Sequence, residues 1–203
     1  VQEPMASHTT FRIGGPADYF VMPETVEELA KVLKLCKEKS MPYFILGNGS
    51  NLLVGDKVFR GVVIQLYKNF DGIQIEGTKV TAKAGAMLIR VAKESGKAGL
   101  TGLEFASGIP GCLGGAVMMN AGAYGGEMQQ VLMEITALYD DGIRHLTAEE
   151  AKLGYRHSTF CEDGGVVLGA KVRLTKDDPA AIRGRMDDLM ARRKATQPLE
   201  YPS

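Results

Sequence analysis

Glycines are concentrated in two stretches of this sequence, where their spacing suits the binding of an anion. The stretch from Glu104 to Gly126 holds seven glycines in 23 residues, and a second stretch, Gly47-Asn48-Gly49-Ser50-Asn51, lies between two apolar runs. Because glycine accepts φ > 0 and lets the backbone approach a ligand closely, several amide groups can converge on one anion. We predict two loops that clamp an elongated, phosphate-containing ligand, which we interpret as a dinucleotide. The spacing of Gly47 to Asn51 alone also fits a tight hairpin turn, since Asn-Gly is a common turn pair.

The common nucleotide-binding motifs are absent from these stretches. A Walker A loop requires Gly-Lys-Ser/Thr, but the Gly96-Lys97 pair is followed by Ala98. A Rossmann fingerprint that began at Gly47 would require a third glycine where Leu52 stands. The sequence therefore indicates a dinucleotide site of a different fold.

A second candidate element is Gly154-Tyr155-Arg156-His157-Ser158-Thr159-Phe160, in which polar and aromatic residues alternate. An arginine held in a site can stabilise negative charge that develops during a reaction, because its guanidinium stays protonated. The alternative for Arg156 is a surface salt bridge. The three histidines, His8, His145 and His157, are far apart and form no ligand pattern, so no metal site is predicted.

Several secondary-structure elements are needed to position these residues. Thr25 and Glu28 form a capping box ahead of a helix that runs to Lys39, and helical patterns also cover Leu88 to Ser95, a short segment after Pro110, and Pro179 to Lys194. We expect one or two helical turns between Ala148 and Leu153, and core packing for Met118 and Met119. Strands are predicted over the following segments: Tyr19 to Met22, a buried Tyr43 to Leu46, Val62 to Leu66, Ile73 to Glu76, Lys79 to Ala84, Ile135 to Tyr139, Ile143 to Leu146 and Val166 to Leu174.

The overall composition is that of a globular protein with balanced charge. The 203 residues are 45% hydrophobic, and 24 basic residues cancel 24 acidic ones, which argues against nucleic acid or a membrane surface as a partner. No apolar run approaches the roughly 20 residues that span a bilayer, and the start lacks a signal-peptide pattern. The three cysteines, Cys36, Cys112 and Cys161, support neither a disulfide framework nor a zinc site. We expect a cytoplasmic protein that is a monomer.

Taken together, five motifs closely resemble the UDP-N-acetylenolpyruvoylglucosamine reductase family. They are Thr9 to Ala17, Gly47 to Leu53, Gly102 to Gly111 with Gly114-Gly115-Ala116, Asn120 to Gly125, and Tyr155 to Ser158. The resemblance runs over essentially the whole chain, in the same order. It implies the FAD-binding fold shared with vanillyl-alcohol-oxidase-type proteins. The expected fold is α+β with two FAD-binding subdomains: residues 1 to 67, a small mixed sheet with a helix, and residues 68 to 178, a larger and mostly antiparallel sheet with helices.

The resemblance also implies an activity. In this family, NADPH reduces FAD, and the flavin then reduces UDP-N-acetylglucosamine enolpyruvate to UDP-N-acetylmuramate for peptidoglycan, and so for cell-wall biogenesis, cell shape and cell division. By similarity Arg156 would stabilise the enolate-like intermediate and touch the flavin. The residues that would bind FAD, without a covalent link, are Gly47, Asn48, Gly49, Ser50, Asn51, Leu52, Ser107, Gly108, Ile109, Pro110, Gly111, Gly114, Gly115, Ala116, Asn120 and Gly122.

The sequence departs from the family pattern at its end. Residues 179 to 203 are expected to form a helix and a tail leading to a third, substrate-binding domain whose Gly-Ser motif and later glutamate are absent here. Ser203 follows Tyr201-Pro202, so the proton-donor role is not assigned to it. We expect an incomplete form of the reductase that binds FAD without completing turnover. Two alternatives stay open, a non-catalytic FAD-binding module and a flavin-dependent oxidase of the same fold.

Overall fold

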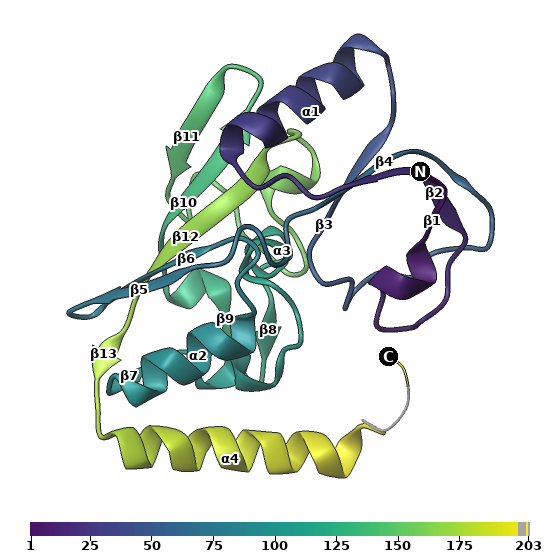
Figure 1. Cartoon of the computed structure of the whole chain (residues 1–203). Coiled ribbons are helices and arrows are strands. Elements are labelled where there is room, and N and C mark those ends of the chain that lie inside the picture. Colours follow the sequence, from purple (N-terminus) through teal and green to yellow (C-terminus); the bar gives the residue numbers. More distant parts are fainter. Residues whose placement is uncertain (199–201, 203) are drawn as a thin grey trace.

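The computed structural model describes residues 1–198 and residue 202, and its architecture is α+β (Figure 1). Residues near the N-terminus form a four-stranded mixed sheet in the order β1-β2-β4-β3. Its strands are β1 (Glu3–Pro4), β2 (Pro16–Val21), β3 (Tyr43–Leu46) and β4 (Phe59–Gln65). The β2–β4 and β3–β4 pairs are parallel, whereas β1 runs antiparallel to β2.

A second sheet of five strands follows, and every pair in it is antiparallel. The strand order is β11-β10-β12-β6-β5. The bounds are β5 (Ile73–Glu76), β6 (Lys79–Lys83), β10 (Leu132–Tyr139), β11 (Gly142–Leu146) and β12 (Val166–Arg173). Two short ribbons complete the strands: β7 (Leu100–Thr101) with β13 (Thr175–Lys176), and β8 (Gly122–Ala123) with β9 (Gly126–Glu127). The mixed and antiparallel sheets confirm the predicted fold class.

Four α-helices lie around these sheets. Helix α1 (Val26–Glu38) begins at Thr25, whose hydroxyl accepts a hydrogen bond from the Glu28 N–H at 3.1 Å. The other helices are α2 (Leu88–Lys97), α3 (Leu113–Met118) and α4 (Pro179–Thr196), and 3-10 turns occur at η1 (Met5–His8), η2 (Glu104–Gly108), η3 (Met128–Gln130) and η4 (Thr159–Cys161). Figure 1 shows α1 at one end of the molecule and α4 along the opposite end, next to α2.

One hydrophobic cluster joins the two sheets. It packs Leu29 of α1 and Ile64 of β4 against Leu138 of β10 and Leu168 of β12, all of them buried. A separate, larger cluster lies under the five-stranded sheet, and a small one lies on the other face of the first sheet. Because a shared close-packed core resists relative movement, the loops that leave the two sheets keep a fixed spacing.

Three local predictions differ from the structure. Strand β3 is an edge strand that pairs only with β4, so Tyr43 and Phe44 are 40% and 42% exposed instead of buried. Met118 is 38% exposed at the end of α3, so the core position expected for it is wrong. Residues 148–153 contain hydrogen-bonded turns, from the Ala151 N–H to the Thr147 carbonyl and from the Lys152 N–H to the Glu149 carbonyl, but no assigned helix.

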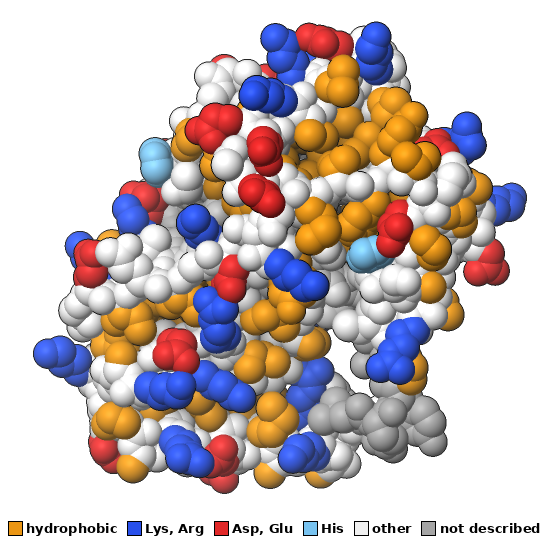
Figure 2. All heavy atoms as spheres, viewed as in Figure 1, with side chains coloured by type: hydrophobic (Ala, Val, Ile, Leu, Met, Phe, Trp, Pro, Cys, Tyr) orange, Lys and Arg blue, Asp and Glu red, His pale blue; other side chains and the backbone are white. Residues whose placement is uncertain are grey.

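The surface divides into two kinds of region. Figure 2 shows hydrophobic side chains gathered over the four-stranded sheet and α1, and many Lys and Arg side chains over α2 and α4. Within the described residues, no helix combines the length and the apolar character needed to cross a membrane.

Candidate functional site

The two glycine-rich loops meet in space, although about 60 residues separate them in the sequence. The Asn48 Nδ2 atom donates to the Pro110 carbonyl at 2.5 Å. A β-carbon placed on Gly47 would lie 3.3 Å from the Cys112 Sγ atom, and one on Gly111 would lie 3.6 Å from the Ser50 Oγ atom. The structure therefore brings Gly47 to Asn51 and Pro110 to Cys112 together at one junction.

Backbone donors are available at this junction. Within residues 1–198 and residue 202, the N–H groups of Gly49, Ser50, Asn51 and Gly115 donate no hydrogen bond to another residue. A β-carbon on Gly115 would meet no atom within 4 Å, so this position faces open space. Unpaired amides around an open position are the arrangement that binds phosphate oxygens.

Gly49 shapes the first loop through its own conformation. Its φ is +71°, and a β-carbon there would lie 1.9 Å from the His8 carbonyl oxygen. The Gly49 carbonyl in turn accepts a hydrogen bond from the Thr10 N–H at 3.1 Å. Only glycine fits this contact, because any side chain would collide with backbone.

The Cys112 thiol is buried between the loops. Burial raises its pKa to about 11, although a hydrogen bond from the Asn48 N–H acts in the opposite direction. The thiol is thus protonated at neutral pH, and it is 3% exposed. It fills the space beneath Gly47 and supports the junction from inside.

Some residues predicted to bind the cofactor lie inside the protein. Leu52, Ile109 and Ala116 pack against the hydrophobic clusters. A β-carbon on Gly114 would lie 2.9 Å from the Ala84 β-carbon, so Gly114 allows α3 to approach the sheet. These positions shape the loops from behind, while Gly115 is the one that faces outward.

Ser107 and Gly108 face α4 and are turned away from the junction. The Ser107 hydroxyl donates to the Glu104 carbonyl at 2.7 Å, and Ser107 lines a cavity of about 430 Å³ between α2 and α4. A β-carbon on Gly108 would lie 3.3 Å from Arg193 of α4. The structure therefore does not bring these two residues together with the open donors.

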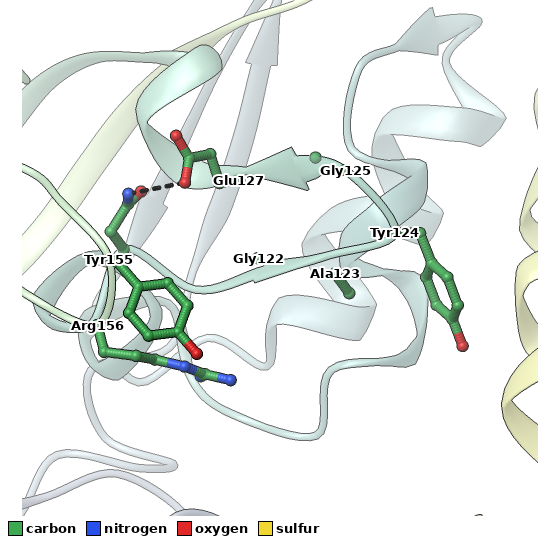
Figure 3. A pocket seen from close by; sticks show the side chains of 9 residues that line it. Gly122, Ala123, Tyr124, Gly125, Glu127, Tyr155 and Arg156 are labelled. Atoms are coloured by element: carbon green, nitrogen blue, oxygen red, sulfur yellow. Dashed lines mark hydrogen bonds between the residues drawn. The ribbon is translucent and has the colours of Figure 1, made fainter. Parts of the chain in front are cut away.

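Arg156 borders a separate cavity of about 280 Å³. The cavity is lined by Asn120, Gly122, Ala123, Tyr124, Gly125, Gly126, Glu127, Tyr155 and Arg156. Figure 3 shows the Tyr155 and Arg156 side chains close together, whereas Tyr124 points away from them. In the described part of the chain, no carboxylate lies within 4.0 Å of the Arg156 guanidinium, so the surface salt bridge considered from the sequence does not form.

Asn120 contributes to this cavity as a scaffold. Its Nδ2 atom donates to the Glu127 carboxylate at 3.1 Å and to the Gly154 carbonyl at 3.2 Å, and its Oδ1 atom accepts from the Gln129 N–H at 2.9 Å. The side chain is therefore fully used inside the protein. Gly122 lies on the β8–β9 ribbon, opposite Glu127, and lines the cavity with its backbone.

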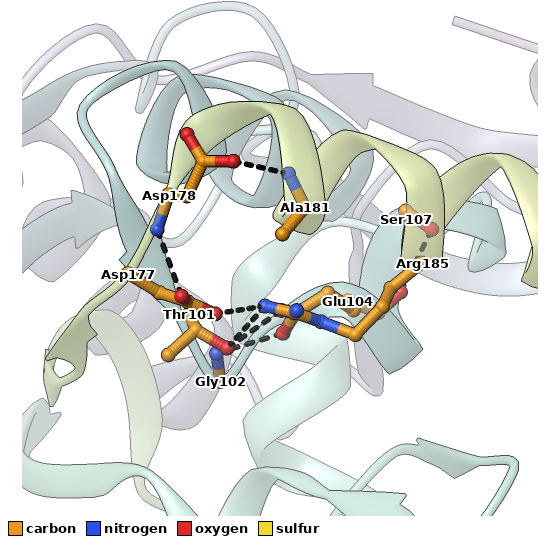
Figure 4. Close-up of polar contacts among 8 residues, drawn as sticks. All are labelled: Thr101, Gly102, Glu104, Ser107, Asp177, Asp178, Ala181 and Arg185. Carbon is orange, nitrogen blue, oxygen red and sulfur yellow. Dashed lines mark hydrogen bonds and ion pairs between the residues drawn. The ribbon is translucent and has the colours of Figure 1, made fainter.

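Sequence reasoning missed an ion-pair network that holds α4 to the body of the protein. Arg185 of α4 contacts Glu104 at 2.8 Å and Asp177 at 2.6 Å, and it donates to Thr101 at 3.1 Å (Figure 4). Burial acts to raise the Glu104 pKa, but hydrogen bonds from Thr101, the Gly102 N–H and Arg185 outweigh it and leave the pKa below its usual value. The Asp177 pKa is lowered mainly by the Arg185 hydrogen bond.

We predict that this network makes the docking of α4 pH-dependent. Both carboxylate pKa values are lowered in the folded state, so the stabilisation is present above the usual carboxylate pKa of about 4 and is lost as the pH falls through the lowered values. Arg185→Met should unfold at a lower urea concentration than the parent chain at pH 7. The difference between the urea midpoints of the variant and the parent chain should shrink toward pH 3.

The matched control for this experiment is Arg183→Met. Arg183 lies on the same helix, but its ion pair with Asp187, at 3.8 Å, is exposed. Its urea midpoint should stay close to that of the parent chain. If the urea midpoint of Arg185→Met differed from that of the parent chain by the same amount at pH 7 and pH 3, the proposed pH dependence of the network would be contradicted.

The described residues contain no group of three or more His, Cys, Asp or Glu side chains placed to hold a metal ion. His8 contacts Glu3 at 2.8 Å and stacks on Phe20, with the ring centroids 4.0 Å apart. His145 and His157 lie near Glu134 and Glu162, at 3.3 Å and 3.9 Å. Each histidine thus has a separate protein partner.

Comparison with known proteins places this arrangement in context. The FAD binding domain family matches residues 17–147. The chain is 53% identical over 200 residues to a UDP-N-acetylenolpyruvoylglucosamine reductase of Clostridium novyi, covering 98% of this chain and 65% of that protein. It is 48% identical to the corresponding protein of Alkaliphilus oremlandii, covering 100% of this chain and 67% of that one. The chain thus spans about two thirds of the length of these relatives.

Solved structures agree with the sequence comparison. The crystal structure of UDP-N-acetylenolpyruvylglucosamine reductase from Thermus caldophilus superposes with a TM-score of 0.82 at 35% identity, over 96% of this chain and 69% of that one. A solvent-stable cholesterol oxidase matches with a TM-score of 0.65 at 16% identity, over 86% of this chain and 37% of that one, which shows a shared fold alone.

Proposed function

Because this chain belongs to the UDP-N-acetylenolpyruvoylglucosamine reductase family and contains its FAD binding domain, we propose that it forms the FAD-binding part of an NADPH-dependent reductase. The substrate would be UDP-N-acetylglucosamine enolpyruvate and the product UDP-N-acetylmuramate, a precursor of peptidoglycan. The observation that carries the proposal is the junction of the two glycine loops, with its unpaired N–H groups, at one end of α3, and the Arg156 cavity at the other end.

The spacing of these two features suits an extended cofactor. Helix α3 has six residues, so it separates the loop junction from the turn that carries Arg156 by roughly 9 Å. A dinucleotide whose diphosphate binds at the junction would extend along this distance toward the cavity. We propose that FAD lies between the sheet of residues 1–67 and the sheet of residues 68–178.

The residues of the chain would divide the work between binding and charge stabilisation. The N–H groups of Gly49, Ser50, Asn51 and Gly115 would hold the diphosphate, and the Asn48 side chain would keep the loops together. When bound, FAD supplies the hydride chemistry that no side chain can perform. Arg156 would stabilise negative charge on the enolpyruvyl group during its reduction, since the guanidinium has no carboxylate partner in the described structure.

We further propose a monomeric, cytoplasmic protein without nucleic-acid or membrane partners that supports cell-wall biogenesis, cell shape and cell division. The equal numbers of basic and acidic residues support the absence of a polyanionic partner. NADPH as the donor and the UDP-sugar as the substrate follow from the family resemblance. Residues 199–201 and 203, at the end of the predicted tail toward a substrate-binding domain, lie outside the described residues.

The test is the visible absorption spectrum of the purified chain after addition of FAD, before and after anaerobic NADPH. Oxidised-flavin bands that stay with the protein through gel filtration and are released as FAD by acid would support the cofactor assignment. Bleaching by NADPH in preference to other donors would favour the reductase over an oxidase. A chain that remains colourless with excess FAD would contradict the proposal.

We predict that Gly111→Val weakens FAD binding while the fold is retained. A β-carbon at this position meets only the Ser50 Oγ atom within 4 Å, at 3.6 Å, so the substitution would place a branched side chain between the loops. The FAD dissociation constant should rise at least about tenfold, equivalent to about 1.4 kcal/mol, in a fluorescence titration.

Gly184→Val is the control for this substitution. Gly184 lies on α4, and a β-carbon there meets no atom within 4 Å. Its FAD affinity should equal that of the parent chain. Equal affinities for Gly111→Val and the parent would exclude the loop junction as the cofactor site.

A further inference from the structure

We infer that Asn120 and Ser158 are positioning residues for Arg156, and that they hold the turn that carries it against the C-terminal end of α3. The inference rests on the proposed function, in which the Arg156 guanidinium acts on the substrate. The polar side-chain atoms of Asn120 and Ser158 form hydrogen bonds within the protein, so neither residue is assigned a role in binding a ligand.

The turn itself is short and poorly supported by its own side chains. The Gly154 N–H donates to the His157 carbonyl at 3.0 Å, and the His157 N–H donates to the Gly154 carbonyl at 3.2 Å. Tyr155 is 92% exposed, and Arg156 has a φ of +55°, which is unfavourable for a residue with a β-carbon. A conformation of this kind persists only where the surrounding structure imposes it.

Ser158 supplies the first attachment. It is completely buried, and its hydroxyl donates to the Met118 carbonyl at 2.6 Å. Met118 is the last residue of α3, where the helix leaves carbonyl groups without an intrahelical partner. The bond therefore satisfies the end of the helix and fixes the residue that follows the turn.

Asn120 supplies the second attachment, at the other side of the turn. It is 4% exposed and has a φ of +41°, a conformation that asparagine adopts more readily than most residues. One donor of its side chain holds the Gly154 carbonyl and the other holds Glu127, on the β9 wall of the same cavity. The turn is thus connected to both α3 and the opposite wall.

The two attachments together determine where the guanidinium lies. Both involve residues 118–120, at the C-terminal end of the helix that begins at the glycine loop. Movement of either anchor would displace Arg156 relative to the loop junction. A misplaced catalytic group lowers the rate even when its charge is retained.

Hydrogen exchange in the chain as it stands tests the first anchor without any cofactor. In Ser158→Ala, the Gly154 and His157 amides should exchange about tenfold faster by NMR, because the loss of one buried hydrogen bond favours local opening. Ser95→Ala is the matched control: Ser95 is also fully buried, and its hydroxyl donates to the Val91 carbonyl at 2.8 Å, within α2. Unchanged exchange in Ser158→Ala, or equal acceleration in Ser95→Ala, would overturn the inference.

Two substitutions test the second anchor. Asn120→Asp keeps the shape and the acceptor for Gln129 but loses both donors, while Asn120→Gly removes the side chain and relieves the left-handed backbone. Both should accelerate exchange at Gly154 and His157 about tenfold, with the amides of β12 still protected. Acceleration in neither variant would contradict the role of Asn120.

A potentiometric titration of the FAD-loaded chain then connects position with function. Arg156→Ala should lower the midpoint potential of the bound flavin, because a nearby positive charge stabilises the reduced form. Ser158→Ala and Asn120→Asp should shift the potential in the same direction by a smaller amount, and Ser95→Ala should not. An unchanged potential in Arg156→Ala would contradict the proposed function. If both anchor variants showed faster exchange but an unchanged flavin potential, only the positioning role of Asn120 and Ser158 would be contradicted.

Discussion

Arg156→Ala should reduce the turnover of UDP-N-acetylglucosamine enolpyruvate by about 10² to 10³ fold, the loss seen when one group that stabilises developing charge is removed. The assay requires a protein of the relatives' full length that carries these residues, with NADPH consumption followed in the presence and absence of the UDP-sugar. FAD binding should be unchanged, because the Arg156 cavity lies a helix length from the loop junction. The effect should therefore appear in kcat, with little change in flavin content.

Two further variants separate the roles of charge and geometry. Arg156→Lys keeps the positive charge but loses the planar fork, so it should recover part of the activity. Arg144→Ala removes another exposed arginine, one that pairs with Asp141 at 2.7 Å and lies over the Tyr139 ring, and should leave turnover unchanged. If Arg156→Ala retained the parent turnover, Arg156 would have no part in the reaction.

Gly49→Ala should destabilise the chain by on the order of 3 kcal/mol and abolish FAD binding. The added β-carbon would lie 1.9 Å from the His8 carbonyl oxygen, and the φ of +71° disfavours any residue other than glycine. The loop would have to leave η1, which would remove the unpaired amides from the junction. Urea unfolding and an FAD titration of the same samples measure the two effects.

Gly77→Ala isolates the contribution of backbone conformation. Gly77 has a φ of +61°, but a β-carbon there meets no atom within 4 Å. The free energy of unfolding should fall by about 1 kcal/mol, the cost of a left-handed conformation alone, and FAD binding should be retained. Equal destabilisation by the two substitutions would show that the His8 contact is unimportant.

Features determined by neighbouring residues could be predicted from the sequence. The Thr25 cap and the inward face of α1 follow from residues three and four positions apart, and the β10–β11 hairpin follows from its Asp140-Asp141-Gly142 turn. The dense glycines likewise indicated loops with unusual backbone conformations, and the structure places two of these loops together. The roles of individual loop residues in binding FAD stay predictions.

Features that depend on distant parts of the chain could not be predicted in this way. Glu104 and Arg185 are 81 positions apart, and no local pattern links them. The exposure of Tyr43 and Phe44 follows from the position of β3 at the edge of the sheet, which the apolar run itself does not encode. The inward direction of the Asn120 side chain depends on Glu127 and Gly154, which reach it only in the folded protein.

The buried thiol of Cys112 makes the loop junction observable by chemical labelling. A disulfide reagent reacts with the thiolate, and burial keeps this group protonated and covered. Cys161 is exposed and should react first, whereas Cys112 can react only when the two glycine loops separate. Cys36 is buried as well, so the measurement uses Cys36→Ala, in which Cys112 is the buried thiol that remains. The slow phase of labelling would then time the spontaneous opening of the junction, and a ligand that bridges the loops would lengthen it.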